Sequence, residues 1–185
     1  LPSSGGGRAA ESPHDGVQWA DFAPDGGALL IVRDFGGRNR LEYPAGRVLY
    51  ETGGWVSHPR FSPGGKWIAF IDHPVRADDR GDVAFVPVCG GEVRRLTGTW
   101  LSAQGLAWGA SGEEVWFTAA ETGSARSVRA VSLAGARRFV YAGAGSLTLH
   151  DATRDGRLLI SRDDTRLEIM GGATEAGEER KLSRK

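Results

Sequence analysis

Residues 58–71 read HPRFSPGGKWIAFI, and residues 82–97 read DVAFVPVCGGEVRRLT. The first stretch has two apolar strand-like runs joined by a short polar turn. In that turn Pro63 presets φ for the first position, and Gly65 can take a positive φ at the exit. The second stretch alternates like a strand, turns at residues 89–92 and continues into another short apolar run. Together the two stretches predict one four-stranded antiparallel unit.

This pattern recurs along the chain. Matching hairpins begin at Trp19, Pro59, Gly105 and His150, and their turn glycines are Gly26, Gly65, Gly112 and Gly156. The glycines are spaced by roughly the 40 to 45 residues of a propeller blade. The sequence therefore predicts an all-β fold, a partial β-propeller of about four blades, each a four-stranded antiparallel sheet.

The repeat also divides the chain. Residues 1–16 are small and polar, which predicts a flexible N-terminal segment, and residues 173–185 are a polar C-terminal end that we interpret as a truncated last strand. The predicted blades cover residues 17–57, 58–104, 105–149 and 150–172.

Composition narrows the classes of function. The 185 residues carry a formal net charge of zero, so bulk charge favours neither a nucleic-acid partner nor a membrane surface. Apolar runs are strand-length and fall short of the roughly 18 to 20 residues of a membrane span, so we predict no membrane insertion by this chain. Cys89 is the single cysteine, which excludes an intrachain disulfide.

The repeat resembles the TolB-like, WD-type β-propeller repeat, in which a Phe-Ser-Pro-Asp-Gly turn precedes Gly-Gly and Leu-Thr. The likeness covers residues 17 to about 172 and is strongest in the second repeat, where Gly64 replaces the aspartate of the pattern. The stretches FIDHPVRADDRGDVA and QGLAWGASGEEVWFTA also resemble the sensor half of acidobacterial membrane-anchored serine/threonine protein kinases. These resemblances imply a propeller that senses a ligand or binds a protein.

Motifs for chemistry are missing from the sequence. It contains no kinase loop, no G-x-S-x-G elbow and no phosphate loop, so we predict a non-catalytic module with no cofactor. Two alternatives stay open: the propeller portion of a prolyl-oligopeptidase-type hydrolase, and a Tol-type periplasmic scaffold. The compartment follows from the context, periplasmic or extracytoplasmic behind a membrane segment and otherwise cytoplasmic.

The resemblance also implies a larger protein. TolB-like rings close with six or more blades, so four blades would leave open faces and strand edges. The first residue is Leu1 rather than Met, which agrees with a fragment. We therefore expect the remaining blades of the same protein to be a partner of this chain.

A propeller binds ligands at one rim, where the connections between strands two and three and between blades lie. We expect a protein or small-molecule ligand there. The candidate binding residues are Trp55, His58, His73, Asp78, Asp79, Arg80, Trp100, Gln104 and His150.

Each candidate also has a structural interpretation. Trp55 and Trp100 precede predicted inner strands, where they either grip a ligand or fill gaps between blades. The loop with Asp78 and Asp79 matches no EF-hand spacing, and a solvated loop is favoured over a calcium site. His58 and His150 begin predicted inner strands, and channel histidines either bind an anion or metal or make structural hydrogen bonds. No metal-binding spacing occurs, so we predict no metal site.

Overall fold

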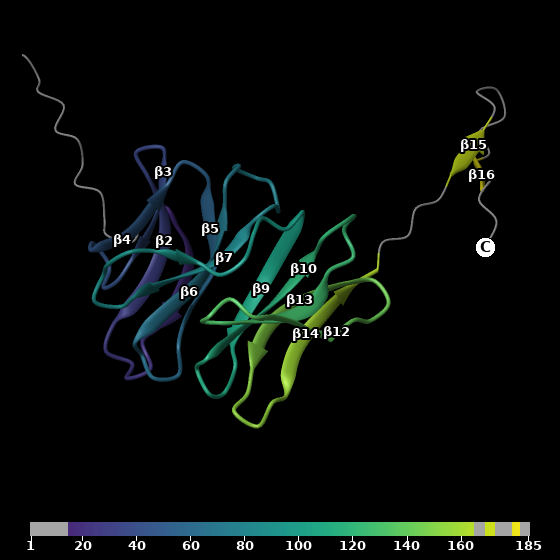
Figure 1. The fold of residues 1–185 in the computed structure, drawn as a ribbon. Helices are drawn as coiled ribbons and strands as arrows, with labels where there is room; N and C mark the ends of the chain where they lie inside the picture. Colours follow the sequence, from purple (N-terminus) through teal and green to yellow (C-terminus); the bar gives the residue numbers. More distant parts are fainter. Residues whose placement is uncertain (1–14, 165–168, 173–178, 182–185) are drawn as a thin grey trace, which may run out of the picture.

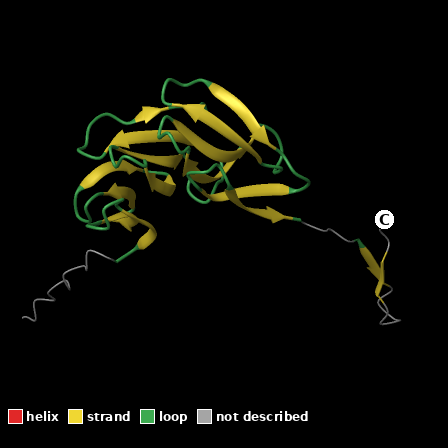
Figure 2. Ribbon diagram, turned by 90° about the horizontal axis from the view of Figure 1, so that it is seen from below, coloured by secondary structure: helices red, strands yellow, loops and turns green. Residues whose placement is uncertain are grey.

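The computed structural model describes residues 15–164, 169–172 and 179–181. These residues form strands and loops and contain no helix (Figure 2). Most of the predicted N-terminal segment and most of residues 173–185 lie outside the described residues, although Glu179–Lys181 within the second segment form a strand.

Three antiparallel sheets of four strands follow one another along the chain (Figure 1). The first contains β1 (Val17–Phe22), β2 (Leu29–Phe35), β3 (Arg38–Glu42) and β4 (Val48–Thr52). The second contains β5 (Trp55–Phe61), β6 (Trp67–His73), β7 (Asp82–Pro87) and β8 (Arg94–Arg95). The third contains β9 (Ser102–Trp108), β10 (Glu114–Ala120), β11 (Ser127–Ser132) and β12 (Arg137–Tyr141).

The fourth repeat differs from the first three. β13 (Ser146–Ala152) pairs with β14 (Leu158–Asp163), and β15 (Met170–Gly172) pairs with β16 (Glu179–Lys181). Among the described residues these pairs form two separate two-stranded sheets, and Figure 1 shows the second apart from the blades. Contacts run from β1 to β5, from β5 to β9 and from β9 to β13, so the first strands of successive sheets lie next to one another. The predicted all-β propeller is confirmed.

Strand β6 shows how the blades pack. Successive side chains of a strand point to opposite faces of its sheet. Ile68 and Phe70 join an apolar cluster with the first blade, whereas Ala69 and Ile71 join a second cluster with the third blade. Blade 2 therefore packs against a neighbouring blade on each of its two faces.

The predicted turns form as the sequence indicates. In the first hairpin of blade 2, Gly65 has φ 65° and its N–H donates to the Ser62 carbonyl at 2.8 Å. Equivalent bonds close the other three turns, and every turn glycine takes a positive φ, at 71° in Gly26, 73° in Gly112 and 85° in Gly156.

Each inner strand carries a β-bulge. The pairing register shifts between Val17 and Trp19 in β1 and between Ser57 and Arg60 in β5. It also shifts at Gly105 in β9 and at His150 in β13. A bulge re-aims side chains and bends the strand. The inner strands begin before the predicted repeat starts, at Trp55, Ser102 and Ser146, so His58 and His150 lie within strands rather than at their beginnings.

Candidate functional site

The strand order places one set of loops at one rim. Neighbouring strands in each sheet run antiparallel, so the β2–β3 and β4–β5 connections leave blade 1 on the same side. The same holds for the β6–β7 and β8–β9 connections of blade 2. The longest of these loops follows His73 and runs to Gly81, and it borders the loops of blade 1.

A pocket of about 320 Å³ opens at this rim between blades 1 and 2. The indoles of Trp19 and Trp55, both half-buried, form its apolar walls. The other lining residues are Gln18, Asp34, Arg76 and Ala77. Two tryptophans with a few polar groups at one side are the usual composition of a ligand pocket.

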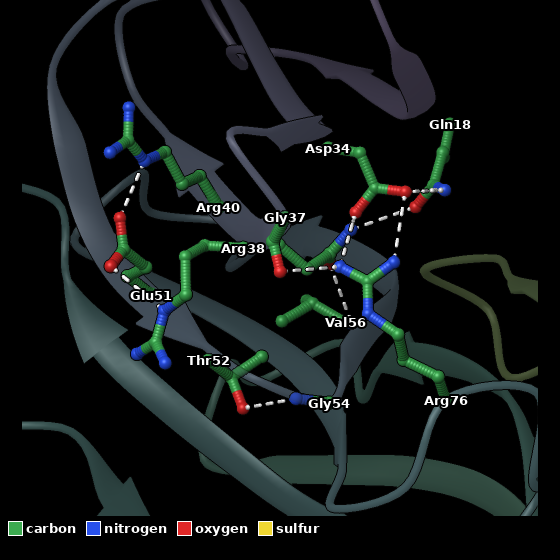
Figure 3. A network of polar contacts seen from close by, with 11 residues as sticks. Gln18, Asp34, Gly37, Arg38, Arg40, Glu51, Thr52, Gly54, Val56 and Arg76 are labelled. Atoms are coloured by element: carbon green, nitrogen blue, oxygen red, sulfur yellow. Dashed lines mark hydrogen bonds and ion pairs between the residues drawn. The ribbon is translucent and has the colours of Figure 1, made fainter.

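The polar side of the pocket is held by one buried amide. Asn39 donates from Nδ2 to Asp34 Oδ1 at 3.0 Å and to Gln18 Oε1 at 2.9 Å, and its Oδ1 accepts the Val56 N–H at 2.8 Å (Figure 3). Arg76 Nη2 pairs with Asp34 Oδ1 at 2.9 Å. The hydrogen bond from Asn39 and the bonds from Arg76 lower the pKa of Asp34. The network joins strands of both blades to the long loop and holds the polar side of the pocket in place.

Trp55, which forms one wall of the pocket, contacts both His73 and the loop that follows His73. Its indole stacks on the imidazole of His73, with ring centroids 3.8 Å apart, and its Nε1–H donates to the Asp78 carbonyl at 3.1 Å. His73 Nδ1 lies 2.9 Å from the Arg80 carbonyl. Asp78 and Arg80 form an ion pair at 2.6 Å, which lowers the pKa of Asp78 to about 2. These contacts bind the loop to the pocket wall.

Behind the pocket, one serine links two histidines. The Ser57 hydroxyl lies 2.7 Å from His73 Nε2 and 2.9 Å from His58 Nδ1. His58 also packs on Trp19, with centroids 4.2 Å apart, and has φ 51° in the bulge of β5. Burial and then Arg60 lower the pKa of His58 to about 3, and burial lowers the pKa of His73 against its bond to the Arg80 carbonyl. Both imidazoles are therefore neutral at neutral pH.

The structure separates Trp100 from the pocket. Trp100 is 6% exposed, packs edge-on against Phe117 and lies under the guanidinium of Arg129 at 4.5 Å. These three residues border a smaller cavity of about 180 Å³ beside the contact of blades 2 and 3. Of the two predicted rim tryptophans, Trp55 alone lines the rim pocket, and Trp100 packs between blades.

The other predicted residues lie towards blades 3 and 4. The Asp79 carbonyl accepts the N–H of Ala103 at 2.8 Å, and its carboxylate lies 3.9 Å from Arg126. Gln104 lies in β9, where its carbonyl accepts the Thr118 hydroxyl. His150 is exposed, with Nε2 2.8 Å from the Ser161 hydroxyl. None of the three lines the pocket.

The described residues hold no group of three or more His, Cys, Asp or Glu side chains that could bind a metal ion. That part of the chain also has no helix long and apolar enough to cross a membrane.

Sequence reasoning missed five residues that line the pocket, and Ser57 behind it; the five are Gln18, Trp19, Asp34, Arg76 and Ala77. Trp19 and Arg76 belong to different blades, and nothing in their spacing shows that they meet. One signal was present: aligning the turn glycines Gly26 and Gly65 places Trp19 opposite His58 of the second repeat.

Comparison with known proteins gives the fold. A scan against family models finds no matching family, and a search of curated proteins finds no matching relative. Among solved structures, TolB from Acinetobacter baumannii matches 90% of this chain and 43% of its own, with TM-score 0.62 and 16% identity. A putative TolB from Agrobacterium tumefaciens matches 91% and 62%, with TM-score 0.60 and 16% identity.

A puromycin-hydrolysing peptidase from Mycobacterium tuberculosis matches 91% of this chain and 32% of its own, with TM-score 0.61 and 17% identity. The chain thus spans less than two thirds of each of these three structures. At such identities the likeness concerns the fold, and propellers carry many unrelated functions.

Proposed function

Since this chain has a TolB-like β-propeller fold, we propose that it is a non-catalytic binding module whose ligand enters the pocket between Trp19 and Trp55. The observation that carries the proposal is the pocket between blades 1 and 2, with aromatic walls and one polar side. Its volume of about 320 Å³ suits an apolar side chain of a protein partner or a small molecule of similar size.

The polar side sets how the ligand is oriented. Arg76 is about half exposed and already paired with Asp34, so the pocket presents a neutral donor-and-acceptor edge rather than a bare charge. A ligand with one apolar group and one neutral polar group, such as a side chain next to its peptide bond, satisfies both parts. A lone ion would leave the indole walls without a partner.

The test is binding of a library of short peptides with aromatic and aliphatic residues, followed by tryptophan fluorescence. We expect wild type and Trp116→Phe, which removes an indole outside the pocket, to bind the same peptides. Trp55→Ala should lose them, and Arg76→Ala, which changes an exposed loop side chain, should bind more weakly. Equal binding by Trp55→Ala and Arg76→Ala and the wild type would contradict the proposal.

We further propose, from the sequence resemblance, that the module is the sensor part of a membrane-anchored serine/threonine protein kinase. The alternatives are the propeller of a prolyl-oligopeptidase-type hydrolase and a Tol-type scaffold. The flanking gene sequence decides between them. A kinase domain and a membrane span upstream support the first, a G-x-S-x-G domain downstream the second, and a signal peptide with neither domain the third.

A further inference from the structure

The hydrogen bonds through Ser57 have a fixed direction. The Arg80 carbonyl can only accept, so His73 Nδ1, 2.9 Å away, carries a hydrogen. In neutral His73, Nε2 is then an acceptor, and the Ser57 hydroxyl donates to it. The Ser57 oxygen in turn accepts from His58 Nδ1, which leaves His58 Nε2 as a lone pair.

Protonation of His73 reverses the direction of the hydrogen bonds through Ser57. His73 Nε2–H then donates to the Ser57 oxygen, and the hydroxyl turns to donate to His58 Nδ1. His58 stays neutral, because it releases its Nδ1 hydrogen to solvent and takes a hydrogen from solvent on Nε2. A proton that arrives at His58 Nε2 can follow the same route: the Nδ1 hydrogen passes to Ser57, and the hydroxyl hydrogen passes to His73 Nε2. One proton is gained, and the positive charge ends on His73.

The surroundings favour the charge on His73 rather than on His58. Asp72 of β6, with Asp78 and Asp79 of the long loop, acts on His73 in the sense that stabilises its cation. The stacked indole of Trp55, 3.8 Å away, stabilises a cation in the same way.

His58, in contrast, has positively charged groups around it. Burial disfavours a cation there most, and Trp19 of β1 packs on the ring. The positive groups that act in the same direction are Arg60 of β5, His73 of β6, His150 of β13 and Arg126 before β11.

Arg60 has no carboxylate partner among the described residues. Its guanidinium donates to the Pro59 carbonyl at 3.0 Å and reaches the His150 carbonyl on β13 at 3.4 Å. The Arg60 side chain of blade 2 therefore reaches the backbone of the inner strand of blade 4. His58 adopts φ 51° in this bulge, a conformation that costs free energy in a non-glycine residue and is frequent at functional sites.

We propose that Arg60 and His58 bind an oxyanion at the axis of the propeller, and that His73 takes up a proton as the anion binds. Arg60 supplies the charge and its free N–H donors. His58 Nε2 is an acceptor in the unbound chain and becomes a donor to the anion when Ser57 reverses. The site is separate from the pocket of the proposed function, since neither Arg60 nor His58 lines that pocket.

Isothermal titration of the whole chain with sulfate, at constant ionic strength in chloride, tests the proposal. Titrations in buffers of different ionisation enthalpy count the protons taken up, and acetate gives a parallel carboxylate arm. We expect binding with net proton uptake near neutral pH. Binding of sulfate alone assigns the site to phosphate-like groups, and binding of acetate alone assigns it to carboxylates; either supports the proposal.

Nitrogen NMR of the histidine rings gives an independent readout in the wild-type chain. His58 should carry its hydrogen on Nδ1 without anion and on Nε2 with anion, while His73 becomes doubly protonated. Arg60→Gln should weaken sulfate binding about tenfold or more, because hydrogen bonds to a charged group are lost. Ser57→Ala should still bind sulfate, but its His58 tautomer should no longer follow the state of His73.

Arg157→Gln, which removes an exposed arginine of the β13–β14 turn, is the matched control and should bind as the wild type does. The proposal is overturned if neither anion binds, if Arg60→Gln binds as well as the control, or if binding leaves the His58 tautomer unchanged.

Discussion

The indole of Trp55 lies parallel to the imidazole of His73, with ring centroids 3.8 Å apart and 11° between the ring planes. One ring is a wall of the rim pocket, and the other is fully buried and bonded to the long loop of blade 2. The stack therefore connects the ligand-facing surface with the interior of the blade. A change in the charge of His73 acts directly on the pocket wall.

The two buried histidines predict how stability depends on pH. The folded-state pKa of His58 is about 3 and that of His73 is also lowered, whereas an unfolded histidine titrates near 6.5. Below about pH 6.5 the unfolded chain binds more protons, so stability present above that pH should be lost as the pH falls. Urea unfolding at several pH values between about 7 and 5 measures the slope of the free energy of unfolding against pH.

His58→Gln should flatten this slope by up to about 1.4 kcal/mol per pH unit, the contribution of one histidine. The carboxylates with lowered pKa values, such as Asp78, titrate below this window and do not obscure it. Equal slopes in the variant and the wild type would show that His58 is not held neutral by the fold.

Substitution of Arg126 should cause a large loss of stability. Arg126 is 8% exposed and donates to the Leu147 carbonyl and to the hydroxyls of Ser102 and Thr148, which joins blades 3 and 4. Arg126→Gln leaves these acceptors without partners and should cost about 2 to 4 kcal/mol in chemical unfolding. Arg157→Gln, in an exposed pair, should change stability by less than about 0.5 kcal/mol.

A side chain introduced at Gly105 should clash with the neighbouring inner strand. Gly105 has φ 76°, and a Cβ at this position would lie 2.2 Å from the Leu149 carbonyl oxygen of β13. Gly105→Ala should therefore destabilise the chain by about 3 kcal/mol or more, since both strain and overlap act. Gly36→Ala, with φ 57° and open space around it, should cost about 1 kcal/mol. Similar losses in both variants would show that the strands separate easily.

Replacing Asp82 by asparagine should stabilise the chain. Asp82 pairs across the strands with Asp72, and each carboxylate has one buried oxygen, Oδ1, without a hydrogen-bond partner. Burial raises the pKa of Asp82, and the neighbouring carboxylate contributes in the same direction. Asp82→Asn should raise the melting temperature at neutral pH, with a gain of about 0.5 to 1 kcal/mol, because a neutral amide costs less to bury than a carboxylate and removes the repulsion from Asp72. This gain exceeds the loss of the ion pair with Arg95, whose nitrogen lies 3.6 Å from the Asp82 carboxylate.

Asp72→Asn is the matched comparison and should lower stability. Asp72 accepts hydrogen bonds from Tyr50 at 2.8 Å and from Arg95 at 2.5 Å, and an amide weakens both. If the two substitutions had the same effect, the repulsion between the carboxylates would be negligible.

The fold could be predicted from the sequence because its signals are local. Gly26 and Gly65 must adopt positive φ to close their turns, and the alternating strands beside them determine which residues face each neighbouring blade. These local signals did not predict how the strands of the fourth repeat pair. β14 (Leu158–Asp163) has one partner strand among the described residues, although the repeat predicted a four-stranded sheet.

The site was less predictable because it depends on contacts between blades. Trp55 and Trp100 have similar places in their repeats, yet the first lines a pocket and the second is buried against Phe117. Neighbours from the adjacent blade decide between these environments. Trp19 and Arg76 belong to the pocket for the same reason, and no spacing within one repeat indicates it.

The bulges of the inner strands have a consequence for how such a protein can change. Each one leaves a residue outside the ladder, and these residues differ between blades, with Gln18, His58, Gly105 and His150 in successive inner strands. A substitution there leaves the register of the hairpin untouched, apart from Gly105, where Leu149 blocks any side chain. The inner strands thus carry different chemistry at Gln18, His58 and His150 on one repeated scaffold.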